Sequence, residues 1–139
     1  MRIPFVRLDG SLEAIFRAHA TDAGTDLFSL ADVPLAPGET ARIPINMAVG
    51  LVDGYFGLLT GRSSAAARGL LVHLGTVDQG YRGPLFVAVT NVSAEPQEVK
   101  RGERIAQLVV LPFTLPQFVE VEALDATERG ERGWGSSGR

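Results

Sequence analysis

The clearest pattern along this chain is a strict alternation of apolar residues with other residues between positions 43 and 52. Ile43, Ile45, Met47, Val49 and Leu51 recur at every second position, which is the period of a β-strand. Long apolar patterns with the 3.6-residue period of a helix are scarce, whereas the chain contains 16 glycines and 8 prolines. These features predict an all-β domain with many turns.

Other apolar runs predict further strands, each bounded by turn residues. The segment after position 103 is apolar on both faces, so we expect that strand to be buried on both sides, as it would be at a subunit interface. The Asp53-Gly54 pair predicts a two-residue hairpin turn that leads directly into a partner strand. The strands expected besides 43–52 are residues 3–8, 55–60, 70–74, 85–89, 104–111 and 112–121, and residues 33–39 are expected to form a strand, a turn at Pro37-Gly38 and the start of a second strand.

A single short helix interrupts this β pattern. Residues 65–68 favour helix, and Gly69 fits the position that follows a helix end. Ser63 or Ser64 is the expected N-cap. Residues 11–20 have a mixed pattern, which predicts a loop or a short turn of helix.

Composition and charge narrow the range of possible functions. The chain has 139 residues, 45% of them hydrophobic, which is enough for one domain with a real core. A net charge of −3 and a pI near 5.3 argue against nucleic-acid binding. The chain has no cysteine and only two distant histidines, so any metal would be a hard cation on oxygen ligands, such as Mg²⁺ carried by a phosphate. No signal peptide or membrane span is visible, and a cytoplasmic location is expected.

The strongest candidate for chemistry is the stretch 75–83, in which three glycines mark tight turns. Between the glycines lie Asp78, Tyr81 and Arg82, and the expected strand 85–89 follows. A carboxylate and a phenol held beside a core strand suit an acid/base group and a wall for a small ligand. The alternative is an ordinary turn with a solvated aspartate.

Two further segments carry candidate phosphate-binding groups. Arg62 and Ser63 stand at the expected helix start, where free backbone N–H groups and a guanidinium would bind an anion; the alternative is simple capping chemistry. Gln107 lies in an apolar strand, where a buried amide needs partners; the alternative is a core glutamine bonded to backbone. Arg104 is interpreted as a structural ion-pair or interface residue.

Asp26 and the C-terminal tail are the remaining candidates. Asp26 follows Gly24 and precedes an apolar pair, so it is either a functional carboxylate or a turn aspartate that accepts backbone N–H groups. Residues 129–139 are rich in glycine and serine around the single tryptophan, Trp134. Such a tail is either a disordered terminus or an arm that folds over a ligand and stacks its ring on a base.

Together these stretches resemble the five motifs of the homotrimeric dUTP diphosphatases, or dUTPases. Each motif alone is a weak to moderate signal, but all five occur in the family's order and span nearly the whole chain. They read Ala-Gly-Thr-Asp-Leu (23–27), Gly-Arg-Ser-Ser-Ala (61–65), Gly-Thr-Val-Asp-Gln-Gly-Tyr-Arg-Gly (75–83), Gly-Glu-Arg-Ile-Ala-Gln (102–107) and Arg-Gly-Glu-Arg-Gly-Trp-Gly-Ser-Ser-Gly (129–138).

The resemblance implies a fold and a reaction. The fold would be a jelly-roll-like distorted β-barrel over residues 1–128, with residues 129–139 as a flexible arm that closes over a site of a neighbouring subunit. The assembly would be a homotrimer with shared sites. The reaction would be dUTP plus water to dUMP and pyrophosphate, with Asp78 as the base and Mg²⁺ as cofactor. Asp26 would contact the metal only through water, because the substrate phosphates would be the main ligands of the Mg²⁺.

The resemblance also implies roles for the substrate-binding residues. Tyr81 would pack on the deoxyribose and exclude a 2′-OH, with Phe86 near the base or sugar, while the backbone around residues 73–77 would hold uracil. His73 would be either a base contact or merely a hairpin side chain. The full set of expected substrate-binding residues is Arg62, Ser63, Ser64, His73, Gly75, Thr76, Val77, Tyr81, Phe86, Gln107, Arg129, Trp134, Gly135, Ser136 and Ser137.

Two rival interpretations fit less well. A dCTP deaminase, which resembles dUTPases in fold, carries a glutamate three residues before the asparagine that ends the strand after the central motif. Here that asparagine is Asn91, and Ala88 stands where the glutamate would be. A non-catalytic module that binds nucleotide or a protein partner remains the alternative of a different class.

Overall fold

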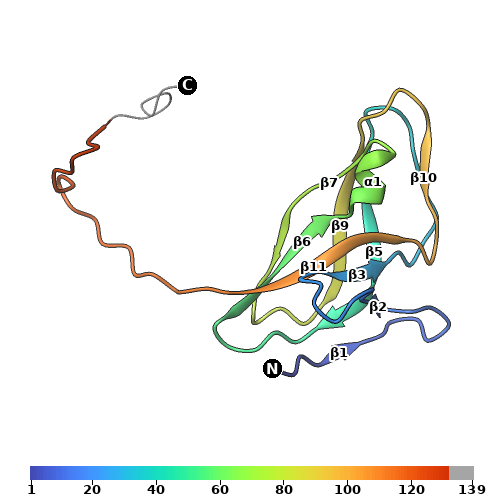
Figure 1. Ribbon diagram of the computed structural model, residues 1–139, viewed down its shortest axis with the longest axis horizontal. Coiled ribbons are helices and arrows are strands. Elements are labelled where there is room, and N and C mark those ends of the chain that lie inside the picture. The colour runs from blue at the N-terminus through green and yellow to red at the C-terminus, as the bar shows by residue number, and fades with distance from the viewer. Residues whose placement is uncertain (132–139) are drawn as a thin grey trace.

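The computed structural model describes residues 1–131, which form an all-β fold with one short helix (Figure 1). The prediction of a jelly-roll-like β-barrel with one helix is confirmed. The elements in chain order are β1 (Phe5–Val6), β2 (Ile15–Phe16), β3 (Thr25–Phe28), β4 (Val33–Leu35), β5 (Thr40–Val49), β6 (Tyr55–Gly61), α1 (Ser63–Ala67), β7 (Leu70–Val72), β8 (Gly75–Val77), β9 (Pro84–Asn91), β10 (Gln97–Val99) and β11 (Arg104–Pro112).

The strands form two main antiparallel sheets and one short ribbon. The four-stranded sheet has the order β1-β5-β9-β7, the five-stranded sheet has the order β2-β3-β11-β6-β8, and β10 pairs with β4. The core lies where apolar side chains of the two main sheets meet, and strict alternation places them there. In β5, Ile43, Ile45 and Val49 are at most 2% exposed, and in β9 Leu85 and Val87 are buried while Phe86 faces outward.

The expected hairpin between residues 43–52 and 55–60 is wrong, although its turn is present. Tyr55 N–H donates to the carbonyl of Val52 across the Asp53-Gly54 turn, yet β6 pairs with β11 and β8 in the other sheet instead of with β5. In the same way β7 pairs with β9, whereas β8 pairs with β6. A turn sequence reverses the chain, but the packing of the core decides which sheet receives the next strand.

The expected last strand is also wrong in the single chain. β11 ends at Pro112, and residues 113–131 form no strand. In Figure 1 this segment runs away from the sheets, and its apolar residues Leu115, Phe118 and Val119 are 79%, 92% and 72% exposed. A strand needs an edge to pair with, and none lies beside this segment within one chain.

Three smaller expectations need correction. Residues 11–20 are mostly loop, which is one of the two predicted alternatives, but they also contain the short strand β2. The cap of α1 is Arg62, with no side-chain capping bond, so Ser63 and Ser64 already lie inside the helix; the expected stop at Gly69 is confirmed by its φ of 76°. β11 is not buried on both sides as expected. Ile105, Ala106 and Leu108 are buried, but the residues on the opposite face of the strand from Leu108 are only half-buried, because no layer of the same chain covers that face.

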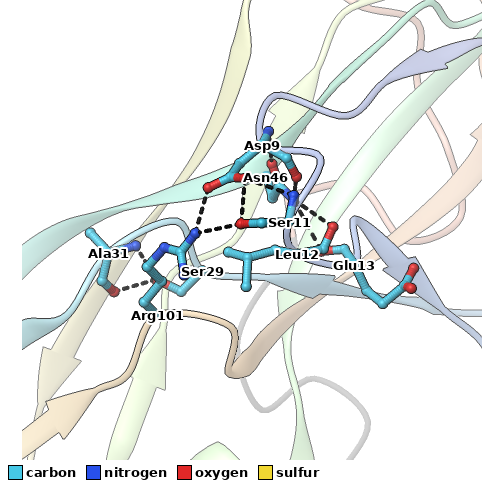
Figure 2. Close-up of polar contacts among 8 residues, drawn as sticks. All are labelled: Asp9, Ser11, Leu12, Glu13, Ser29, Ala31, Asn46 and Arg101. Carbon is cyan, nitrogen blue, oxygen red and sulfur yellow. Dashed lines mark hydrogen bonds and ion pairs between the residues drawn. The ribbon is translucent and has the colours of Figure 1, made fainter.

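A polar cluster ties the N-terminal loop to the sheets (Figure 2). The Asn46 side chain is fully buried; its amide donates to the carbonyls of Asp9, Leu12 and Glu13 at 3.0, 3.3 and 3.2 Å, and its oxygen accepts the Asp9 N–H at 2.7 Å. Arg101 forms an ion pair with the Asp9 carboxylate at 2.5 Å. Hydrogen bonds from the Ser11 hydroxyl and N–H, and then from Arg101, lower the pKa of Asp9 to about 2.

This cluster predicts how stability depends on pH. A carboxylate with a lowered folded-state pKa stabilises the fold above its unfolded pKa, and that contribution is lost as the pH falls towards the folded value. We therefore expect Asp9→Asn to lower the unfolding temperature at pH 6–7, and the gap from the unmodified chain to shrink between about pH 4 and about pH 2. Thermal unfolding across this range measures it, with Asp125→Asn, at an exposed position, as control. A gap independent of pH would contradict this role.

Candidate active site

One half of the site is a cluster of two arginines around a carboxylate. One carboxylate oxygen of Asp26 on β3 forms an ion pair with Arg62 Nε at 2.9 Å, and the other oxygen forms one with Arg104 Nη1 at 3.2 Å. Arg62 Nη1 also donates to the Arg104 carbonyl at 2.8 Å and to Ser64 Oγ at 3.1 Å. The Asp26 side chain is only 15% exposed, and that of Arg62 is 20% exposed. Two guanidiniums against one carboxylate leave a net positive charge, which suits an anion.

Strand register brings together the candidate residues of the first, second and fourth motifs. Gln107 on β11 lies opposite Asp26 on β3 and opposite Thr60 on β6, so these residues share a row across three strands. Gln107 is half-buried, not buried as expected. A Cβ added at Gly24 would overlap the Gln107 side-chain oxygen, which explains why a glycine precedes the carboxylate by two positions.

A cavity opens beside this cluster. It has a volume of about 370 Å³, and Arg62 and Ser63 line it together with Leu70 and Val72. Ser63 is exposed at the start of α1. The cavity therefore offers a guanidinium and a hydroxyl next to an apolar wall.

The other half of the site is a pocket around Asp78 and Tyr81. Both residues follow β8 in the glycine-rich turn. The Tyr81 hydroxyl donates to the Pro84 carbonyl at 2.9 Å, and its N–H donates to the Asp78 carbonyl at 3.0 Å, so the ring is fixed and 44% exposed. The pocket has a volume of about 200 Å³, and its lining comprises Leu59, Thr76, Val77, Asp78, Tyr81, Pro84, Leu85 and Phe86.

The two halves lie far apart within one chain. β6 and β8 are antiparallel, with Leu59 opposite Gly75 and Gly57 opposite Val77. Arg62 therefore follows one end of this strand pair and Asp78 the other. At about 3.3 Å per residue their backbones are roughly 20 Å apart. The sequence candidates thus form two separate groups on a single chain.

His73 belongs to neither cluster but is held firmly. Its N–H donates to the Ala88 carbonyl at 2.9 Å, and its Nε2 is 2.7 Å from the Thr90 hydroxyl, which in turn lies 2.6 Å from the Thr40 hydroxyl. These bonds fix the chain just before Gly75. Of the predicted arm residues, Arg129 lies in the C-terminal segment, whereas Trp134, Gly135, Ser136 and Ser137 fall outside the described residues.

Sequence reasoning missed Arg42, which stacks on Phe86 of the Asp78 pocket. An alternating strand pattern identifies Arg42 only as an outward-facing residue. The interpretation of Arg104 as an ion-pair residue is confirmed by its contact with Asp26.

The donors for a metal are sparse. Residues 1–131 contain no group of three or more His, Cys, Asp or Glu side chains that could hold a metal ion. Both Asp26 oxygens already accept from guanidiniums. The side chains of residues 1–131 therefore do not form a metal site by themselves, and a hard cation would need most of its oxygen ligands from a bound molecule. Within residues 1–131, no helix has the length and apolar character needed to cross a membrane.

The fold and these two clusters define a class: an antiparallel β protein with a cationic cavity and a separate, aromatic-walled carboxylate pocket. The cationic cavity suits phosphate groups, and the aromatic-walled pocket suits a small molecule with a flat ring. The family model described as dUTPase matches residues 11–138. The chain belongs to the dUTPase family, as its five motifs indicated.

Relatives and solved structures agree with this assignment. Deoxyuridine 5′-triphosphate nucleotidohydrolases of Mycolicibacterium vanbaalenii and Nocardia farcinica are 48% and 49% identical, over 96% and 98% of this chain and 92% and 85% of theirs. A variant of the Staphylococcus phage 80alpha dUTPase, bound to dUpNHpp, superimposes with a TM-score of 0.92 at 32% identity, covering 99% of both chains. A phage phi11 dUTPase, whose structure shows coordination of a structural Mg(II) ion, gives 0.81 at 29% identity, covering 88% of this chain and 98% of that one.

The packing of the Tyr81 ring predicts that alanine substitutions at two glycines of the same turn have different effects. A Cβ at Gly83 would collide with the Tyr81 ring, whereas a Cβ at Gly80 would meet nothing within 4 Å. We expect Gly83→Ala to displace the ring, to cost about 1–3 kcal/mol of stability through overpacking and to weaken binding of dUpNHpp. Gly80→Ala is the matched control and should leave both unchanged. Thermal unfolding and calorimetric titration measure the two effects; equal behaviour of the two variants would refute the packing argument.

Proposed function

We propose that this chain hydrolyses dUTP to dUMP and pyrophosphate. The observation that carries the proposal is the pocket in which Asp78 lies beside the fixed ring of Tyr81, in a chain of the dUTPase family. The names of the relatives state the same activity for those proteins.

Asp78 is the proposed general base. Its side chain is exposed, so it is free to accept a hydrogen bond from a water and to take its proton as the water attacks the α-phosphorus. Attack in line with the leaving pyrophosphate needs positioning and charge stabilisation, and no covalent enzyme intermediate. Mg²⁺, held by the phosphates with Asp26 near it through water, would neutralise part of the phosphate charge.

The cationic cluster is the proposed phosphate site. Arg62 would supply charge-assisted donors, and Ser63, which lines the same cavity, would add its hydroxyl. The pairing with Asp26 orients the Arg62 fork before the ligand arrives, so less side-chain freedom is lost on binding. Gln107 lies in the same row of the sheet and would donate its amide to the phosphates.

Tyr81 is the proposed sugar wall. Its bond to the Pro84 carbonyl and its packing over Gly83 hold the ring in one place. A rigid aromatic face against the deoxyribose leaves no room for a 2′-hydroxyl, which rejects UTP. Thr76, Val77 and Phe86 complete the pocket for the base.

We further propose that the working form is a homotrimer with shared sites. The base and the arginines lie too far apart in one chain to act on one phosphate group, so Asp78 of one subunit would meet Arg62 and Gln107 of another. The extended segment after β11, with its exposed apolar residues, suits a crossing to a neighbour. Residues 129–139 would then close over a neighbouring site, with Trp134 stacked on the base.

A product assay on the unmodified chain and on Asp78→Asn tests the reaction. With Mg²⁺, dUTP should yield dUMP and pyrophosphate, and UTP and dCTP should not react. Asp78→Asn should lower kcat by about 10²-fold or more, because the base is lost, while dUpNHpp still binds; Asp53→Asn, a nearby exposed acid, is the control. Release of ammonia from dCTP would indicate a deaminase, and dUTP binding without turnover a regulatory module. Loss of binding together with activity would refute the base assignment.

Mixing two inactive variants tests the shared site. Asp78→Asn and Arg62→Ala chains, unfolded together and refolded, should regain dUTPase activity, because some sites in mixed trimers combine an intact Asp78 with an intact Arg62. Each variant refolded alone is the control. No recovery in mixtures whose mixed composition is verified by native mass spectrometry would show that both residues act from one chain.

A further inference from the structure

Arg42 lies on the outer face of the four-stranded sheet and stacks on an aromatic ring. Its Cζ is 4.0 Å from the centroid of the Phe86 ring. The register places Arg42 opposite Ala88 and Pro44 opposite Phe86, so Arg42 and Phe86 are diagonal neighbours on one face of β5 and β9. Diagonal pairs of this kind are within reach of long side chains.

The stacked ring is part of the pocket around the proposed base. Phe86 lines the same cavity as Asp78 and Tyr81. Tyr81 is fixed by its own hydrogen bond, but Phe86 is 36% exposed and has no polar group to anchor it. The guanidinium of Arg42 stacks on this ring and thereby restricts its rotation.

Arg42 has no competing role among residues 1–131. Within this part of the chain its guanidinium takes part in no ion pair or hydrogen bond, and its side chain is exposed. An exposed arginine without a carboxylate contributes little to stability. Its specific contact is the face of Phe86, where a cation is attracted by the ring electrons.

We infer that Arg42 is a positioning residue that holds the Phe86 ring as a wall of the Asp78–Tyr81 pocket and thereby raises affinity for the nucleoside part of the substrate. The identity of the substrate rests on the proposed function. Arg42 acts through Phe86, so it changes binding and leaves the chemical step alone. An exposed cation–π contact corresponds to a factor of about 2 to 5 in an equilibrium constant.

Kinetics and binding of an Arg42 series test this inference. Arg42→Leu should raise KM for dUTP about 2- to 5-fold with kcat unchanged, and should weaken dUpNHpp binding by the same factor. Arg42→Lys keeps the cation and should recover part of the loss. Arg2→Leu removes the same charge from an exposed position outside this pocket and is the control for net charge.

A double-mutant cycle separates positioning from general effects. In a Phe86→Leu background, Arg42→Leu should cause no further change in KM or in dUpNHpp affinity, because the ring that it positions is absent. Additive effects, a fall in kcat at constant KM, or no effect of Arg42→Leu would each overturn the inference. Absence of dUTP turnover by the unmodified chain would refute the proposed function alone, since the dUpNHpp titrations still report on Arg42; absence of dUpNHpp binding as well would refute both.

Discussion

The carboxylate of Asp26, held between two guanidiniums, is the interaction on which the functional architecture depends. A mostly buried carboxylate needs compensating partners, and here Arg62 and Arg104 supply one to each oxygen. These arginines come from the end of β6 and the start of β11, while Asp26 belongs to β3. The same contacts therefore lock three strands of the five-stranded sheet in register and aim Arg62 at the cavity beside α1.

The antiparallel pairing of β6 with β8 imposes the second constraint. It fixes Asp78 and Arg62 at opposite ends of one strand pair, which separates the two groups of candidate residues on the surface. The proposed homotrimer would bring Asp78 of one subunit to Arg62 of another. The half-buried outer face of β11 and the exposed apolar residues after Pro112 are the surfaces that such an assembly would cover.

Close packing against glycine fixes the position of one large side chain in each of the two groups of candidate residues. Gln107 fills the space that a side chain at Gly24 would take, and Tyr81 does the same at Gly83. At these two positions the glycine provides room for a neighbour, not unusual backbone angles, because neither has positive φ. Small residues thus set the positions of the large functional ones.

The sequence by itself determined the all-β class, the longer strands at 43–52, 55–60, 85–89 and 104–111, the helix stop at Gly69 and the five motifs, because period-two alternation and motif spacing are local properties. It did not determine which sheet receives β6, β7 and β8, since a turn such as Asp53-Gly54 reverses the chain whatever the partner. Local patterns also predicted a strand at 112–121, but strand formation needs an edge that one chain does not supply. The pairing of Arg104 with Asp26 and the stacking of Arg42 on Phe86 join residues distant in sequence. Only the tertiary structure brings those residues within reach, because long-range register decides which side chains share a face.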